Sequence, residues 1–335
     1  MTWSMWGRRV AVGAAALACL CTGGIARASS PPILGVNMQG VDFLTPSAGF
    51  EIVSLVTHPP VPRLYATTDG GQHWLAVPLK IQAQPPVSGD MVLPSAVSFA
   101  SARRGALLVT GSPGACQNGF AVDTTANGGQ TWRTAGWFLG ADGPTDLAAA
   151  ADGPVWVING GCAGTTLTLY QEAAGRMAPL HRFVLPAAQQ GAFGVVSAVS
   201  LQRLPGGKAI VVAAYGGGAS APLLRGYASS DHGATWRPYS VGGANLKGQV
   251  SALGFNGTGE GLALAASAGG AGTLFRTSDG GKAWSAVAND SFAAQGVESI
   301  TWASSRVVYV LAGNRLWRSS DAGATFQQIT QHWRS

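Results

Sequence analysis

Short segments in which apolar and polar residues alternate recur along the chain, and clusters of turn-forming residues separate them. Two consecutive units near the C-terminal end show this most clearly. Each contains four such segments: residues 250–255, 261–266, 273–277 and 283–287 in the first, and residues 297–302, 307–312, 315–319 and 325–330 in the second. Alternation with a period of two is typical of β-strands that bury one face. The pattern therefore predicts repeated units of four short antiparallel strands.

The motif Ser/Thr-x-Asp-x-Gly-x-x-aromatic lies between the third and fourth segments and occurs five times. The copies are residues 67–74, 125–132, 229–236, 277–284 and 319–326. Their Asx residues are Asp69, Asn127, Asp231, Asp279 and Asp321, and their aromatic residues are Trp74, Trp132, Trp236, Trp284 and Phe326. A short Asx side chain hydrogen-bonds the backbone two residues on, Gly permits a positive φ, and the hydroxyl residue forms a second local bond. We expect five structural hairpin turns, each covered by its aromatic ring.

The spacing of the motif gives the number of units. Successive Asx positions are separated by 58 residues (69 to 127), 104 (127 to 231), 48 (231 to 279) and 42 (279 to 321), and a four-stranded blade takes about 40–50 residues. The interval of 104 therefore holds two units, and a degenerate copy fits inside it at residues 171–176. Radial repetition of such units protects strand edges. We predict an all-β propeller of six four-stranded antiparallel blades, with seven blades as the alternative.

The motif and its spacing resemble the Asp-box, or BNR, repeats of sialidases, sortilin-type receptors and Ycf48-like photosystem II assembly factors. The resemblance covers nearly the whole mature chain. It implies the propeller fold more specifically than it implies an activity, because one fold carries many functions. In this family the repeated turns lie on the blade periphery and are structural.

The N-terminal segment has the pattern of an export signal. An Arg pair at residues 8–9 precedes an apolar stretch at residues 10–22, and a small-x-small site lies before Ser29. The apolar stretch is short for a membrane span. We expect residues 1–28 to be cleaved and residues 29–335 to form one propeller domain, secreted or in the cell envelope, with no transmembrane segment after cleavage.

Two cysteines, Cys116 and Cys162, remain after that cleavage. They lie in equivalent loops of adjacent units, so we expect an exported chain to join them in a disulfide, worth about 4 kcal/mol for a loop of about 46 residues. No CxxC spacing occurs and the five histidines are scattered, so neither a metal nor another cofactor is expected. Cys19, in the apolar stretch, leaves lipid attachment as an alternative to release.

The charge balance argues against one class of partner. Cleavage removes three of 21 basic residues, which leaves 18 against 15 acidic ones and a net charge of +3. No run of Lys and Arg occurs, so nucleic acid is not an expected partner. Charged residues make up only 11% of the chain and apolar residues 47%, which fits one rigid β domain with a large core. We expect a monomer.

Successive turns of a meander alternate between two faces, which separates the motif turns from the longest loops. Those loops include residues 80–94, so the face opposite the motif turns is the predicted binding face, with Lys80 and Asp90 as candidate contacts. Three arginines, each four residues before a motif, are further candidates for binding a carboxylate or another anion. They are Arg63, Arg225 and Arg315. The alternative is that their stems pack over neighbouring aromatic rings.

A glycosidase would need paired carboxyl groups. The innermost strands offer only Asp42, Asp146 and Glu298, of which Asp42 and Glu298 would meet across the ring closure. The Arg-Ile-Pro signature of sialidases is absent, since the comparable residues 62–64 fall on a third strand. We therefore favour an exported, non-enzymatic scaffold that is similar to Ycf48 and binds an extracytoplasmic protein or a surface glycan. A sialidase-like hydrolase or a carbohydrate-binding propeller is the alternative.

Overall fold

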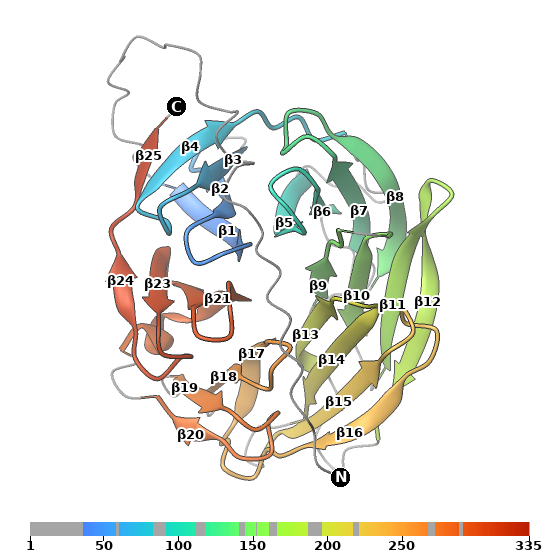
Figure 1. Ribbon diagram of the computed structural model, residues 1–335, viewed down its shortest axis with the longest axis vertical. Helices are drawn as coiled ribbons and strands as arrows, with labels where there is room; N and C mark the ends of the chain where they lie inside the picture. The colour runs from blue at the N-terminus through green and yellow to red at the C-terminus, as the bar shows by residue number, and fades with distance from the viewer. Residues whose placement is uncertain are drawn as a thin grey trace. The chain divides into compact units, whose positions relative to one another are not determined.

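The computed structural model divides the chain into two units, Met1–Pro31 and Pro32–Ser335. The residues it describes all belong to the second unit: 36–57, 60–82, 92–111, 118–140, 145–151, 153–160, 166–186, 196–216, 221–266, 272–287 and 291–334. Within that unit, six sheets are arranged as blades around a central axis (Figure 1). The predicted six-bladed propeller is confirmed.

Each blade is made of four strands that follow one another in sequence and pair antiparallel. Blade 1 holds β1 (Val36–Phe43), β2 (Gly49–Leu55), β3 (Val61–Thr67) and β4 (His73–Val77). Blade 2 holds β5 (Val92–Phe99), β6 (Gly105–Gly111), β7 (Asn118–Thr125) and β8 (Arg133–Gly140). Blade 3 holds β9 (Thr145–Ala148), β10 (Trp156–Gly160), β11 (Thr166–Ala173) and β12 (Arg176–Val184).

The second half of the ring repeats this order. Blade 4 holds β13 (Val196–Leu204), β14 (Lys208–Tyr215), β15 (Leu223–Ser229) and β16 (Arg237–Val241). Blade 5 holds β17 (Gln249–Phe255), β18 (Gly261–Ala266), β19 (Thr273–Thr277) and β20 (Ser285–Ala286). After the 3-10 helix η3 (Ser291–Gln295), blade 6 holds β21 (Val297–Trp302), β22 (Val308–Ala312), β23 (Arg315–Ser319) and β24 (Gln327–Ile329).

The predicted strands of blades 5 and 6 agree with the structure to within one residue at each end, except at the outermost strands. The ranges 261–266, 273–277, 297–302 and 315–319 are reproduced without change, whereas the predicted outermost strands were too long. An outer strand has a partner on one side only, so alternation continues in the sequence after pairing has ended.

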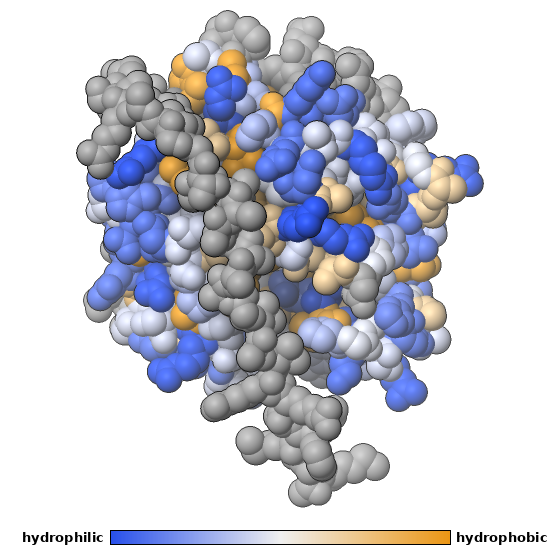
Figure 2. Space-filling view, turned by 45° about the horizontal axis from the view of Figure 1, so that its top comes forward, coloured by the Kyte–Doolittle hydropathy of each residue, from blue (hydrophilic) through white to orange (hydrophobic). Residues whose placement is uncertain are grey.

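The core lies between blades, where the faces of neighbouring sheets meet. Second strands are buried on both faces, which explains their nearly continuous apolar sequence. Aromatic rings join blades directly: Phe50 of blade 1 stacks on Phe99 of blade 2, and Phe43 stacks on Tyr309 of blade 6, both with ring centroids 3.5 Å apart. On the face shown in Figure 2, the coloured side chains are mostly hydrophilic or intermediate, with apolar ones in small separate patches.

A short C-terminal strand, β25 (His332–Arg334), adds a fifth strand to blade 1 and so links the two ends of the ring. It pairs parallel to β4, and the two lie side by side in Figure 1. The fully buried carboxylate of Glu51 on β2 accepts hydrogen bonds from Gln331 Nε2, at 3.1 and 3.2 Å, and from Trp333 Nε1, at 3.0 Å. The C-terminal segment is thus a clasp anchored on one buried acid.

Candidate functional site

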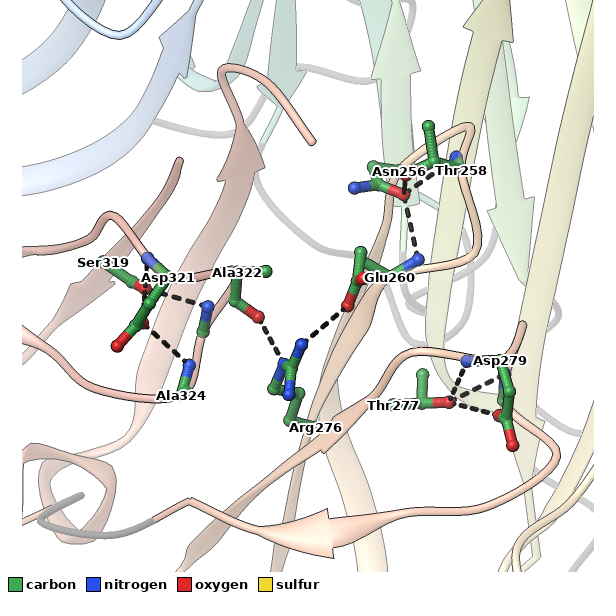
Figure 3. Close-up of polar contacts among 12 residues, drawn as sticks. Asn256, Thr258, Glu260, Arg276, Thr277, Asp279, Ser319, Asp321, Ala322 and Ala324 are labelled. Atoms are coloured by element: carbon green, nitrogen blue, oxygen red, sulfur yellow. Dashed lines mark hydrogen bonds and ion pairs between the residues drawn. The ribbon is translucent and has the colours of Figure 1, made fainter. Parts of the chain in front are cut away.

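The five repeated motifs form turns with one hydrogen-bonding pattern. In the first, Thr67 Oγ1 donates to Asp69 Oδ1 at 3.0 Å and accepts from the N–H of Gly71 at 3.0 Å. The same two bonds recur in the other four copies. Figure 3 shows two of these turns, at Asp279 and Asp321. The predicted bond from the hydroxyl residue is therefore present in all five.

The Asx side chain reaches further along the turn than predicted. Asp69 Oδ1 accepts from the backbone N–H groups of Gln72 and His73, three and four residues on. The expected bond to the N–H two residues on was wrong, because that N–H, of Gly71, donates to the hydroxyl of Thr67 instead. Gly70 and Gly71 have φ values of 76° and 90°, as the prediction requires. The degenerate copy is also a turn, a hairpin in which Ala174 and Gly175 have positive φ.

All five turns are attached to the first hairpin of their own blade. In each, the residue after the Asx position donates its N–H to a carbonyl of the hairpin between the first two strands, over 2.7–2.9 Å. Motif turns and first hairpins therefore share one side of the ring, here called the turn face. The second-to-third-strand loops and the blade connections lie on the other side, here called the loop face.

The Asp279 turn allows a matched test of the Asx side chain. We expect Asp279→Ala to lower the melting temperature by about 2 °C or more, because the backbone N–H groups of Lys282 and Ala283 lose their acceptor. Asp279→Asn should leave it nearly unchanged, since Asn127 makes equivalent bonds in the second copy. Thermal unfolding of both variants checks this. An equal fall in melting temperature in both variants would show that the negative charge of Asp279, and not its hydrogen-bond acceptor, stabilises the turn.

The axial channel contains a cavity of about 820 Å3, lined by the innermost strand of every blade. An innermost strand has a free edge whose N–H groups need acceptors. At five of the six blade junctions, a side chain on one blade accepts the N–H of the next blade's innermost strand. These pairs are Asp42 with Phe99, Ser98 with Ala149, Asp146 with Leu201, Ser200 with Phe255, and Thr301 with Phe43. We call these acceptors the cap residues.

The sixth junction, between blades 5 and 6, uses packing in place of a cap. The equivalent residue is Gly254, and a side chain there would lie 2.6 Å from Ile300. The indole of Trp302 instead donates to the Gly254 carbonyl at 3.3 Å. The caps were not predicted from the sequence, although the innermost strands of the units, when aligned, share a short polar residue near this position.

Two of the three carboxylates named as candidates for the alternative hydrolase function are caps. Asp42 accepts from Phe99 N–H at 2.6 Å and from the Thr301 hydroxyl at 3.1 Å, while Asp146 accepts from Leu201 N–H at 2.7 Å and Leu147 N–H at 2.8 Å. Burial raises the pKa of Asp42 to about 6 and that of Asp146 to about 7, against the opposing effect of these hydrogen bonds. Both side chains are fixed at blade junctions.

The sequence had suggested that Glu298 and Asp42 could meet across the ring closure. Glu298 lines the same cavity but does not meet Asp42. Asp42 is bonded to Thr301, and Glu298 lies three residues earlier on β21, about 10 Å along a strand. Its Oε1 accepts the N–H of Gly313 at 3.2 Å, its side chain is exposed, and partial burial raises its pKa. Glu298 is therefore the accessible carboxylate among the three.

The predicted binding arginines lie apart, on three blades. Arg63 on β3 and Arg315 on β23 are exposed, and Arg225 on β15 is half-buried beside Tyr227, which fits the packing alternative for that residue. None of the three pairs with a described carboxylate. Lys80 is exposed at the end of blade 1. The predicted contact Asp90 and the predicted disulfide between Cys116 and Cys162 lie outside the described residues.

Arg276 ties blade 5 to blade 6 on the turn face. Its Nη2 lies 3.1 Å from Glu260 Oε2, and its Nε donates to the Ala322 carbonyl of the neighbouring motif turn at 2.6 Å (Figure 3).

Within the described ranges, no group of three or more His, Cys, Asp or Glu side chains is arranged to hold a metal ion. In the same part of the chain, no helix is long and apolar enough to cross a membrane.

Comparison with known proteins gives matches of fold only. No protein-family model and no curated protein matches the chain. Among solved structures, the SapL1 lectin in complex with alpha methyl fucoside has a TM-score of 0.52 and 12% identity, over 87% of this chain and 96% of the lectin. Ycf48 bound to a D1 peptide has a TM-score of 0.46 and 18% identity, over 88% and 81%. A GH74 xyloglucanase from Xanthomonas campestris has a TM-score of 0.45 and 14% identity, over 89% and 54%.

One fold carries many functions, so the propeller fold alone does not separate the predicted functions. Only the geometry of this chain's own residues can distinguish a binding function from a catalytic one.

Proposed function

We propose that this protein is an exported, non-catalytic propeller that binds a partner protein through its loop face, as an Asp-box scaffold similar to Ycf48 would. The export part of the proposal rests on the signal-like segment at residues 1–28. The binding part rests on the surface of the propeller itself. A mature N-terminus at Ser29 after expression in a secreting host would support the first part.

The distribution of exposed apolar side chains supports the loop face. Six large apolar side chains of the described residues are 42–70% exposed. Four of them lie at the loop-face end of blades 1 to 4: Val56, Leu139, Val184 and Leu223. The other two, Leu75 and Trp137, lie on outermost strands, and none lies in a motif turn or first hairpin. Single exposed apolar residues are ordinary, but the position of four of the six at the same end of four consecutive blades supports an interaction surface there.

The channel carboxylates support a non-catalytic role. A general acid or nucleophile must reach its substrate with a free oxygen. Asp42 and Asp146 instead accept backbone N–H groups at blade junctions, and Glu298 lies away from Asp42. Arg203, the arginine among the cavity-lining residues, donates to the Pro154 carbonyl and stacks on Trp156 at 4.3 Å.

Site-specific photo-crosslinking tests the proposed face. A photoreactive residue at Val184 or at Leu223, both on the loop face, should give crosslinks to the same envelope protein in the native host. Matched probes at Ser305 and Lys208, exposed in first hairpins of the turn face, should not. Crosslinks from the turn-face positions alone would place the partner on the turn face and contradict the proposal. No protein crosslink from any position, together with retention of the chain on a cell-wall glycan, would favour the carbohydrate-binding alternative.

A further inference from the structure

The innermost strands carry a repeated irregularity at their loop-face ends. In five of the six blades, the pairing of the first two strands shifts by one residue, which leaves a β-bulge. The bulged residues are Gln39, Ser95, Ser197, Ser251 and Glu298. In blade 3 no bulge is described, and β9 begins at Thr145, which pairs with Asn159 and lies one residue before the cap Asp146. We call these six residues the bulge ring.

A bulge leaves one residue outside the hydrogen-bond ladder and re-aims its side chain. Every member of the ring is polar, and all except Ser197 line the cavity. They lie three residues before the cap residues of most blades, and therefore nearer the loop face. The end of the channel nearer the loop face is thus lined by side-chain oxygens from five of the six blades. The hydroxyls of Ser95 and Thr145 also hydrogen-bond Thr110 and Asn159 on the second strands of their own blades.

The charge of this opening is negative. Glu298 is the charged member of the ring, and Asp42 and Asp146 line the cavity further in. The basic and imidazole side chains among the described lining residues are Arg203, Lys208 and His232, all of blade 4. They lie at or near the turn-face hairpin and motif turn, at the opposite end of the channel. Among the described lining residues, those nearest the loop face therefore present oxygen atoms and a carboxylate to a cation.

We propose that the bulge ring binds the ammonium group of a lysine side chain, inserted into the channel from a partner protein. An ammonium is a compact charge with three N–H donors on a flexible four-carbon stem, which suits acceptors arranged around an axis. A guanidinium prefers a planar, bidentate acceptor. The Gly313 N–H holds one oxygen of Glu298, so its carboxylate is already oriented. This inference rests on the proposed loop-face function and names the chemistry of the partner.

NMR titration of the mature chain with Nα-acetyl-lysine amide tests the site directly. The same compound acetylated on Nε is the neutral control, and methyl glucoside tests a sugar. We expect the free amine to bind, the acetylated compound to bind at least about fivefold more weakly, and added salt to weaken the interaction. Equal binding of the two lysine compounds, or binding of the glucoside alone, would overturn the proposal.

Variants of the ring separate this site from a general effect of charge. Glu298→Gln should weaken binding of the free amine by about fivefold or more, and Gln39→Glu, which adds a second carboxylate, should strengthen it. Glu172→Gln removes a carboxylate that pairs with Arg133 away from the channel, and should leave binding unchanged. Melting temperatures establish that each variant is folded. An unchanged affinity in Glu298→Gln would contradict the assignment.

The two proposals fail in different ways. Loop-face crosslinks that persist without any lysine binding would retain the partner-binding function and remove the lysine site. Lysine binding without loop-face crosslinks would retain the site and remove the protein partner.

Discussion

Replacing Trp333 by Ala is expected to destabilise the propeller by about 3 kcal/mol, through the loss of a packed aromatic ring and of a hydrogen bond to a buried acid. For a chain of this size the melting temperature should fall by about 6 °C. Arg334→Ala, on the same strand with an exposed side chain, should change stability by less than about 0.5 kcal/mol. Thermal and denaturant unfolding of the two variants measure the difference.

A double-mutant cycle isolates the hydrogen bond between the clasp and Glu51. Trp333→Phe keeps an aromatic ring and removes the donor, while Glu51→Gln removes the carboxylate that accepts from both Trp333 and Gln331. We expect a coupling energy of about 1 kcal/mol or more between the two positions. If the two substitutions change the free energy of unfolding additively, Trp333 contributes to the clasp by packing and not through its hydrogen bond to Glu51.

Asp42→Ala should destabilise the ring by about 3 kcal/mol, because the buried N–H of Phe99 and the hydroxyl of Thr301 lose their acceptor. Ser98→Ala removes the neighbouring cap, a single neutral acceptor, and should cost about 1 kcal/mol. Asp42→Asn should lie between wild type and Asp42→Ala, since its amide oxygen still accepts one bond. A loss in Asp42→Ala no larger than in Ser98→Ala would contradict the role assigned to Asp42.

The buried acids also predict how stability depends on pH. The pKa of Asp42 rises from 3.8 to about 6, that of Asp146 from 3.8 to about 7, and that of Glu51 from 4.5 to about 7, each because of burial. The folded state therefore binds more protons than the unfolded state between about pH 4 and pH 7, and these groups make stability fall as pH rises through that range. Asp42→Asn combined with Asp146→Asn should flatten the fall. Below about pH 4 the sign reverses at Asp231, whose pKa is lowered to about 2 by hydrogen bonds from the Thr235 hydroxyl and backbone N–H.

The predicted fall in stability can be checked by measuring the melting temperatures of the wild type and of the double variant at intervals between pH 3 and pH 8. The difference between the two profiles isolates the channel acids from the other titrating groups. A double variant whose profile runs parallel to that of the wild type would show that Asp42 and Asp146 are not the source of the slope.

The parts of this structure that could be predicted from sequence depend on local contacts. The hydrogen bonds of the Thr67 and Asp69 side chains join residues no more than four apart, so the motif contains the partners that shape its turn. Its repetition at blade spacing then gives the six blades. The one error within the turn concerned which backbone N–H the Asx oxygen accepts, which depends on the position of the Thr67 hydroxyl.

The channel could not be predicted in the same way, because its contacts are between residues far apart in sequence. Asp42 is 57 residues from Phe99 and 259 from Thr301, and Glu51 is 282 from Trp333. From sequence, Asp42 was a candidate for the alternative hydrolase function because it is one of three acids on the innermost strands. The bulge ring was missed for a related reason. A one-residue shift in pairing exists only once the second strand is in place.

We expect the channel carboxylates to hold the ring together or to bind a partner, and not to catalyse hydrolysis. The decisive experiment is to incubate the purified mature chain, Asp146→Asn and Glu298→Gln with a panel of aryl glycosides that includes aryl sialosides. None of the three proteins should give turnover above the buffer rate. Turnover by the wild type that disappears in Asp146→Asn or Glu298→Gln, with the melting temperature retained, would contradict this expectation.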